Sequence, residues 1–578
     1  MKSLRLLAAF SVAVSALAFT SASTTSPAAA PVRAAQGVAF DRFRNAFLER
    51  YFQLDPYFAV YQGRHDFDGR MPDWSEAGLK QAANFVRDSI ARAQSFPDAA
   101  LTQRQRFERD YLIKVAQGRL FWLEDADQPH TNPAFYIGDG LDPNVYVARN
   151  YAPAPVRMRA FIRFARDVPK AAAQIKANLR TPMPISFIEY GKSAFEGFAA
   201  YYTGDAKVAF AGVRDPKLQA EFDQAAKAAS RAVGELASWL EHNRGTANTD
   251  FALGAARFSR MLLATEGVDT PLDRLEAIGR ADLKRNQDAL RDACAAYAPG
   301  KSIPECMAKM NANKPEGGPV AEARRQIPML TSFVRSQDLA SIPGTEKALV
   351  EEAPPYNRQN FAYIDPPGPY EHGIPSIYYI APPDPSWSKQ MQEDYVPGKA
   401  DLLFTSVHEV MPGHFLQFLH ANRSSSIFGR VFVGYAFAEG WAHYSEEMMW
   451  EAGLGGGSPE IHIGQLSNAL LRNCRLLSAI GMHAHGMTQE ESKKMFRQQC
   501  YQDEGNAQQQ AARGTYDPAY LNYTMGKLMI RKLREDWTAT RGGRAAWKAF
   551  HDQFLSYGGP PIPLVRQQMM GGPAKAVF

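Results

Sequence analysis

The sequence predicts a mainly helical protein that forms one large enclosure around a site, and two observations support this. Long segments without proline are rich in helix-favouring residues, as in Glu76–Ser95, Lys217–His242 and Leu272–Tyr297. One region alone breaks the pattern, because Ala353 to Pro397 contains ten prolines with aromatic residues between them. Proline at that density excludes helix interiors, so we expect a small extended or β insert there.

Composition narrows the class of protein. The 578 residues are 45% apolar and 22% charged, which excludes a mostly disordered or collagen-like chain. The net charge is only +5 and both signs are mixed along the chain, so no nucleic-acid partner is expected. We place a boundary near residue 340, with a helical N-terminal shell over 37–340 and a C-terminal region over 341–578 that is expected to hold the chemistry indicated by the motifs below.

The first residues have the pattern of a secretory signal peptide, 1–22. Lys2 and Arg5 precede an apolar run from Leu6 to Phe19, and small residues follow. The run is short for a membrane span, although a retained signal anchor is the alternative. A flexible lead-in is expected over 23–36. No cysteine lies at the cleavage region and no later segment is long and apolar enough to cross a bilayer, so we expect a periplasmic or secreted protein.

Four cysteines fit an oxidising compartment and allow three pairings. Cys294 and Cys306 enclose a segment with proline and glycine, and Cys474 and Cys500 enclose a turn between two helices. We expect both pairs to be local disulfides. No CxxC occurs, which argues against a cysteine metal site.

Within the proline-rich region, the segments NFAYI and SIYYIA are candidate strands. Tyr378 and Tyr379 belong to the second. They are predicted either to lie on an edge strand that pairs with an extended peptide substrate, or to pack the proline-rich segment. The glycine-rich Gly453–Pro459 does not follow a strand and is interpreted as a loop between helices.

A motif follows this insert, with His408, Glu409 and His414 in the run HEVMPGH. In HExxH zinc peptidases a spacing of four places both imidazoles on one helical face, with the glutamate as general base. Here the spacing is six, which on an unbroken helix rotates the second ring by about 240°. Pro412 and Gly413 permit a break that returns His414 towards His408. The alternative is a helix end with neither histidine bound to metal.

A second motif, EGWAHYSEE, gives a third ligand. Glu439, His443 and Glu446 fall at i, i+4 and i+7 on one helical stripe. Burying them among aromatic residues requires partners, and a metal is one such partner. We expect Glu439 to be the ligand and His443 and Glu446 to support the ligands, with a solvated surface stripe as the alternative.

Four further residues are candidates for the chemistry. Tyr523, in a helix predicted to begin near Pro518, and His483 are candidates for stabilising an oxyanion; each is alternatively structural. Arg472 and Arg475 lie three apart on a helix. Either one is a candidate to bind a substrate carboxylate, and Arg475 is the one we assign, although structural ion pairs are the alternative.

The pair HExxPGH and EGWA resembles the bacterial DUF885 family, as do RNCRLLSAIGMHAHGMTQEES and NYTMGKLMIRKLR over nearly the whole chain. The family is similar to gluzincin-type zinc metallopeptidases. The resemblance implies a large helical zincin-like scaffold, Zn²⁺ bound by His408, His414 and Glu439, and Glu409 as base. Phe415 and Ala479 depart from the family pattern, where His and Asp are frequent, which puts full activity in doubt.

Three functions follow as hypotheses. The first is an exported zinc metallopeptidase that hydrolyses oligopeptides. The second is a metallohydrolase of a non-peptide amide or ester with the same ligands. The third is a catalytically silent binding protein on the same scaffold. The sequence does not separate amino-, carboxy- and endo-specificity, nor give the oligomeric state.

Overall fold

The computed structural model describes residues 29–138, 140–354, 358, 361–572 and 577–578. It is 70% helix and 3% strand, which confirms the predicted mainly helical fold with a small sheet. The three long helices expected from composition are present almost to the residue. The expected signal peptide, 1–22, lies outside the described residues. Helix α1 begins at Ala29, so residues 29–36 are helical and not the flexible lead-in that we expected.

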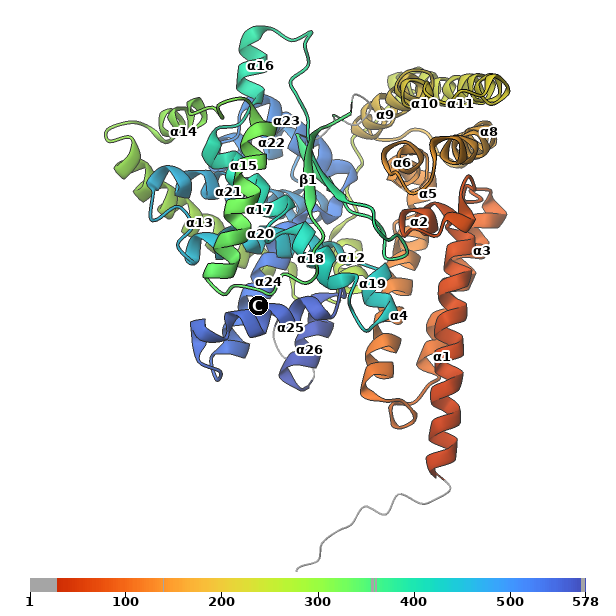
Figure 1. Ribbon diagram of the computed structural model, residues 1–578, viewed down its shortest axis with the longest axis horizontal. Coiled ribbons are helices and arrows are strands. Elements are labelled where there is room, and N and C mark those ends of the chain that lie inside the picture. Colours follow the sequence, from red (N-terminus) through yellow and green to blue (C-terminus); the bar gives the residue numbers. More distant parts are fainter. Residues whose placement is uncertain (1–28, 139, 355–357, 359–360, 573–576) are drawn as a thin grey trace, which may run out of the picture.

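The N-terminal helices, on the right in Figure 1, are α1 (Ala29–Leu54), α2 (Pro56–Tyr61), α3 (Glu76–Gln94), α4 (Gln103–Leu120), α5 (Gln128–Thr131), α6 (Ala134–Gly138), α7 (Asn144–Ala148), α8 (Ala154–Asn178), α9 (Ile185–Thr203), α10 (Asp205–Phe210) and α11 (Pro216–His242). The apolar residues of this region form two large clusters and a small third one, and one of the large clusters also includes Phe428, Val431 and Phe432 from the C-terminal half. Most of these helices fall within 37–340, the range predicted to form a helical shell.

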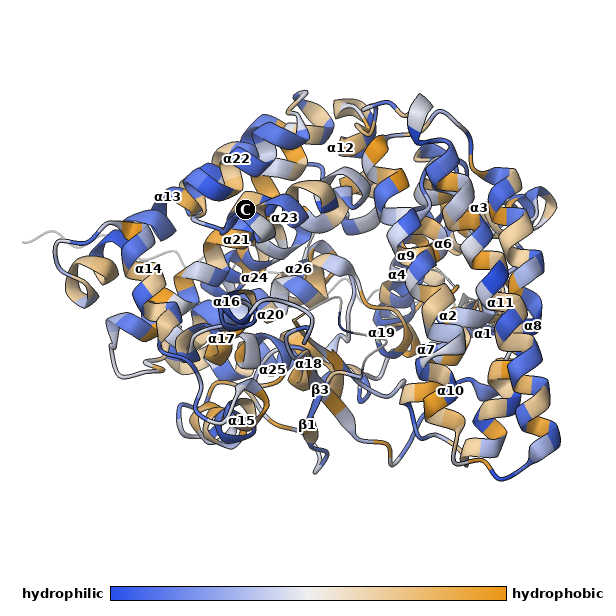
Figure 2. Cartoon of the chain, turned by 90° about the horizontal axis from the view of Figure 1, so that it is seen from above, coloured by the Kyte–Doolittle hydropathy of each residue, from blue (hydrophilic) through white to orange (hydrophobic). Residues whose placement is uncertain are grey.

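The remaining elements are α12 (Ala255–Glu266), α13 (Leu272–Tyr297), α14 (Ile303–Ala312), α15 (Pro319–Ser336), β1 (Ala348–Glu352), β2 (Ala362–Asp365), β3 (Ser376–Ile380), α16 (Lys389–Tyr395), α17 (Lys399–Glu409), α18 (His414–Ala421), α19 (Ile427–Val431), α20 (Tyr435–Glu451), α21 (Pro459–Ala484), α22 (Gln489–Gln499), α23 (Glu504–Tyr516), α24 (Asn522–Thr538), α25 (Trp547–Ser556) and α26 (Ile562–Met570). One apolar cluster joins α12–α15 to these C-terminal helices. The core therefore does not divide at residue 340; α12–α15 pack with the half that holds the motifs (Figure 2).

The sheet has the order β1-β3-β2, with β1 parallel and β2 antiparallel to β3. Strand β3 is therefore the central strand, and the predicted edge position of Tyr378 and Tyr379 is wrong. The backbone of β3 is paired with β1 along one edge and with β2 along the other. It therefore has no free edge to which a peptide substrate could add as a strand. The buried Tyr378 hydroxyl lies 3.5 Å from Ser406 Oγ on α17, and the Tyr379 ring packs on Tyr363 of β2. Tyr378 therefore positions the sheet against the helix of the first motif, and Tyr379 packs within the sheet.

The proline-rich insert is attached to the shell through charged side chains that are buried or partly buried. Arg149 lies 2.8 Å from Asp365 and 3.0 Å from Glu371, and His65 lies 3.1 Å from the other oxygen of Glu371. Gly368 approaches the backbone of Gln62 so closely that a Cβ would overlap it. We call His65, Arg149, Asp365 and Glu371 the insert clamp.

Two disulfides fasten the C-terminal half. Cys294 is bonded to Cys306 and Cys474 to Cys500, the local pairing expected from their spacing. The second joins α21 to the end of α22. Residues 452–457 form turns between α20 and α21, as the glycines predict. None of the described helices combines the length and apolarity that a bilayer crossing requires.

Candidate metal centre

The chain breaks its helix between the two histidines of the first motif. Helix α17 ends at Glu409 and α18 begins at His414. The N–H of Gly413 donates to the carbonyl of Val407 at 2.9 Å, and a Cβ at Gly413 would overlap the carbonyl oxygen of His408. Glycine is thus required by this close approach. The break replaces the expected 240° rotation, and the imidazole centroids of His408 and His414 lie 4.9 Å apart.

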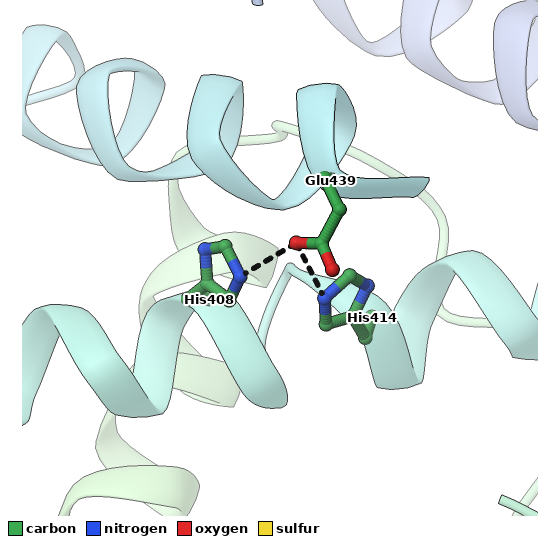
Figure 3. Close-up of side chains that lie close together, drawn as sticks. All are labelled: His408, His414 and Glu439. Carbon is green, nitrogen blue, oxygen red and sulfur yellow. Dashed lines mark hydrogen bonds and ion pairs between the residues drawn. The ribbon is translucent and has the colours of Figure 1, made fainter. Parts of the chain in front are cut away.

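Helix α20 supplies the third side chain. One carboxylate oxygen of Glu439 lies 3.2 Å from His408 Nε2 and 3.4 Å from His414 Nε2 (Figure 3). The indole N–H of Trp441, two residues on, donates to the carbonyl of Pro412 at 2.9 Å. The helix with Glu439 and the loop between the histidines are therefore tied together, and three ligand-type side chains point to one place.

The donor set fits a zinc ion. One atom from each of His408, His414 and Glu439 lies within 4.8 Å of the others. Donors of a tetrahedral zinc site with bonds of about 2.0–2.1 Å are separated by about 3.3 Å. The two observed nitrogen–oxygen separations match that value. Two imidazoles and one carboxylate leave a fourth position open, as catalytic zinc sites do.

The ligands are supported by a buried chain of polar side chains. His408 Nδ1 donates to Glu446 at 2.7 Å. This contact would leave Nε2 as the nitrogen available to a metal once the ring is neutral. Arg472 neutralises Glu446 at 3.2 Å, which is the ion-pair alternative for this arginine. His443 also contacts Glu446, at 3.2 Å. Because His443 and Glu446 are fully buried, the surface-stripe alternative is wrong.

This network of buried polar side chains extends to Asp401, a residue that the sequence analysis did not single out. Arg472 donates to the carbonyl and side-chain oxygens of Asn468 at 2.9 Å, and Asn468 donates to Asp401. Asp401 lies seven residues before His408, two turns earlier on the same helical stripe. That seven-residue spacing could have indicated that Asp401 lies on the same side of the helix as His408.

Burial and neighbouring charges set the protonation of the group. Burial raises the pKa of Glu439, but the contacts with His414 and His408 lower it by a larger amount. The pKa of Glu439 therefore falls well below its usual range. Burial and Arg472 lower the pKa of His408, but its bonds to Glu439 and Glu446 raise it on balance to about 9. Burial lowers the pKa of His443 to about 4, so this residue is neutral at pH 7.

Glu409 and Tyr523 flank the ligands. Burial raises the pKa of Glu409, which suits a group that exchanges protons near neutrality. No hydrogen bond holds its carboxylate within the described part of the chain. The Tyr523 ring, on α24, lies 6.3 Å from the His408 ring at 17°. Arg475 is buried against the same tyrosine, with its guanidinium carbon 4.6 Å from the ring centroid.

His483 does not join this group, and its proposed electrophilic role is wrong. Its Nε2 donates to the carbonyl of Gly514 at 2.7 Å, and its Nδ1 accepts from the N–H of Leu253 at 3.3 Å. Burial lowers its pKa to about 4. Both nitrogens are consumed by backbone groups, so it is a structural histidine. Phe415 and Ala479, the two departures, lie buried in the main apolar cluster.

Comparison with known proteins gives a family and a fold. Residues 56–569 match the model of a bacterial protein of unknown function, DUF885. The structure is similar to a candidate lipoprotein of unknown function from Shewanella oneidensis, with TM-score 0.75, 25% identity, and 92% of this chain and 99% of that one covered. It is also similar in fold to a candidate lipoprotein from Colwellia psychrerythraea, with TM-score 0.79, 17% identity, and 92% and 98% covered. No curated protein matches.

Proposed function

The chain belongs to the DUF885 family, and we propose that it is an exported zinc-dependent hydrolase of peptide bonds in oligopeptides. The observation that carries the proposal is the convergence of His408, His414 and Glu439 with Glu409 beside them. The disulfides and the description of the two structural neighbours as candidate lipoproteins support export. The zincin-like relationship is part of this proposal.

His408, His414 and Glu439 would hold the metal. A bound zinc ion supplies Lewis acidity, which makes water more acidic and polarises a carbonyl oxygen. Glu446 fixes the His408 ring through Nδ1, and Arg472 keeps Glu446 ionised in its buried position. The protein thus holds the ligands in a fixed arrangement before a metal binds.

Glu409 would accept a proton from the attacking water and later give it to the leaving amine. Its partial burial and raised pKa make both transfers feasible near neutral pH. The Tyr523 hydroxyl would donate a hydrogen bond to the oxyanion that develops on the substrate carbonyl. This tyrosine is buried, and burial followed by the nearby Glu439 raises its pKa, so the phenol keeps its proton.

The test is a Glu409→Gln substitution measured for metal and for turnover. We expect stoichiometric zinc by elemental analysis, as in the unmodified protein, and a 10³-fold or greater loss in digestion of a peptide library followed by mass spectrometry. The matched control is Glu393→Gln, because Glu393 is an exposed glutamate on α16. Full turnover by the Glu409 variant would refute the role of the base.

The same measurements separate the other hypotheses. A panel of acylated small molecules is digested in parallel, and cleavage of that panel alone would favour a non-peptide amide or ester. Protein purified without chelator that contains no stoichiometric metal would favour the silent binding protein.

A further inference from the structure

Three arginines surround the Tyr523 ring beside the candidate metal centre. Arg472 and Arg475 come from α21 and Arg513 from α23. Their guanidinium carbons lie 5.8, 4.6 and 5.9 Å from the ring centroid. Three cations around one aromatic ring repel one another, so each needs its own anion.

Two of the three have an anion within the chain. Arg472 lies 3.2 Å from Glu446, and Arg513 lies 2.9 Å from Asp517. Arg513 also donates to the hydroxyl of Tyr435 at 2.8 Å. Both guanidinium groups are thus neutralised by a carboxylate that the fold itself supplies.

Arg475 has no such partner. Among the described residues its guanidinium makes one hydrogen bond, from Nε to the neutral Gln510 at 2.8 Å, and no carboxylate lies within ion-pair distance. The side chain is only 8% exposed. Burial, followed by the charge of Arg513, lowers its pKa. The face of Tyr523 offsets part of the cost of burying this cation, but an unpaired buried charge is otherwise strongly unfavourable.

Arg475, the unpaired cation, lies close to the proposed metal ligands because both are near the ring of Tyr523. The centroid of the Tyr523 ring lies 4.6 Å from the guanidinium carbon of Arg475 and 6.3 Å from the centroid of the His408 ring. The guanidinium carbon is therefore no farther from the His408 ring than the sum of these two distances, about 11 Å. One or two residues of extended peptide, at about 3.5 Å each, span such a separation.

We propose that Arg475 binds a carboxylate of the substrate one or two residues from the bond that is cleaved. A guanidinium pairs with a carboxylate through two parallel hydrogen bonds, which fixes both distance and orientation. This inference rests on the proposed function for the identity of the bond. The carboxylate is either the C-terminus of a short peptide or an acidic side chain next to the cleaved bond.

The experiment compares three pools of N-acetylated tetrapeptides without other acids: one with free carboxyl ends, one amidated, and one amidated with a single internal glutamate. Turnover of each pool by the zinc-loaded protein is followed by mass spectrometry. Binding is measured separately, without turnover, by affinity selection of each pool on the Glu409→Gln protein. We expect at least a 30-fold preference for one of the two acidic pools over the plain amidated pool.

Arg475→Met should reduce that preference to less than about threefold in both measurements. Arg475→Lys should restore part of it, because lysine keeps the charge but loses the paired geometry. Arg513→Met is the matched control: it removes a cation from the same ring, but one already paired with Asp517, so the preference should remain. Circular dichroism and zinc content verify that each variant is folded.

The outcomes separate the two proposals. Preference for the free-carboxyl pool identifies the C-terminus as the ligand, and preference for the glutamate pool identifies the side chain. Equal turnover and equal retention of all pools, or no retention of any, overturns the role of Arg475. Selective retention without hydrolysis by the unmodified protein overturns the proposed function and leaves the carboxylate site standing.

Discussion

Two buried polar regions meet helix α20 through neighbouring residues, and they differ in how completely their charges are paired. Glu446 faces the metal centre. Glu447 faces a group that we call the paired cluster, in which Lys527 lies 2.7 Å from Asp282 and 3.1 Å from Glu447. Arg285 contacts both of these carboxylates, at 2.7 and 2.9 Å. Arg531 lies 2.8 Å from Glu447.

The difference indicates which region is built for structure and which for binding. In the paired cluster every charged group lies beside an oppositely charged one, and the cluster joins α13, α20 and α24. At the metal centre Glu439 faces two histidines, Glu409 has no hydrogen bond within the described residues, and Arg475 has no carboxylate there. Groups left without partners in a buried region are costly, and a bound metal and substrate would supply those partners.

The largest expected effect is in the paired cluster. Lys527→Met removes the fully buried cation and leaves Asp282 and Glu447 with only partly exposed arginines. We expect the free energy of unfolding to fall by about 3–5 kcal/mol, measured by denaturant titration. Zinc content per folded molecule should not change. A loss below about 1 kcal/mol would mean that the cluster contributes little to stability.

A smaller effect distinguishes the two neighbouring glutamates. Glu446→Gln weakens the bond that orients His408, and we expect zinc affinity to fall about 10–100-fold in a competition titration with a chelator. Glu447→Gln is the matched control, because it changes only the paired cluster. Equal zinc affinity in the two variants would contradict the assignment of Glu446 to the metal centre and of Glu447 to the paired cluster.

The smallest effect is at the insert clamp and depends on pH. Burial lowers the pKa of His65, but its bonds to Asp68 and Glu371 raise it on balance to about 9. The unfolded value is about 6.5, so its stabilisation is complete below that pH and is lost as pH rises through about 9. Because His65 is partly exposed, we expect at most about 1 kcal/mol.

The measurement is the melting temperature of the unmodified protein and of His65→Gln between pH 6 and pH 10. The difference should be largest at pH 6 and should vanish near pH 10. A difference that stays constant over this range would assign the effect to packing and not to charge.

The helices and the convergence of His408, His414 and Glu439 were predictable because their signals are local. Proline-free segments gave helix limits almost to the residue, and Pro412-Gly413 indicated the break that returns His414. The stripe of Glu439, His443 and Glu446 depends only on helical spacing. Such features need no knowledge of distant chain segments.

The errors involve contacts that are distant in sequence. Tyr378 is on a central strand because β1, which starts at Ala348 and lies parallel to β3, covers its other edge. His483 is structural because its partners come from Leu253 and Gly514. Arg472 and Arg475 differ only in whether a carboxylate from another helix reaches them, and no local pattern reveals that.

The tie between Trp441 and the carbonyl of Pro412 has a consequence for which ions the protein accepts. It fastens the loop between the histidines to the helix with Glu439, so the ligand positions are fixed by the fold. Mg²⁺ and Ca²⁺ require six or more oxygen ligands and a site that adapts to them. A rigid pair of imidazoles with one carboxylate would discriminate against these abundant ions and would favour a scarcer transition metal.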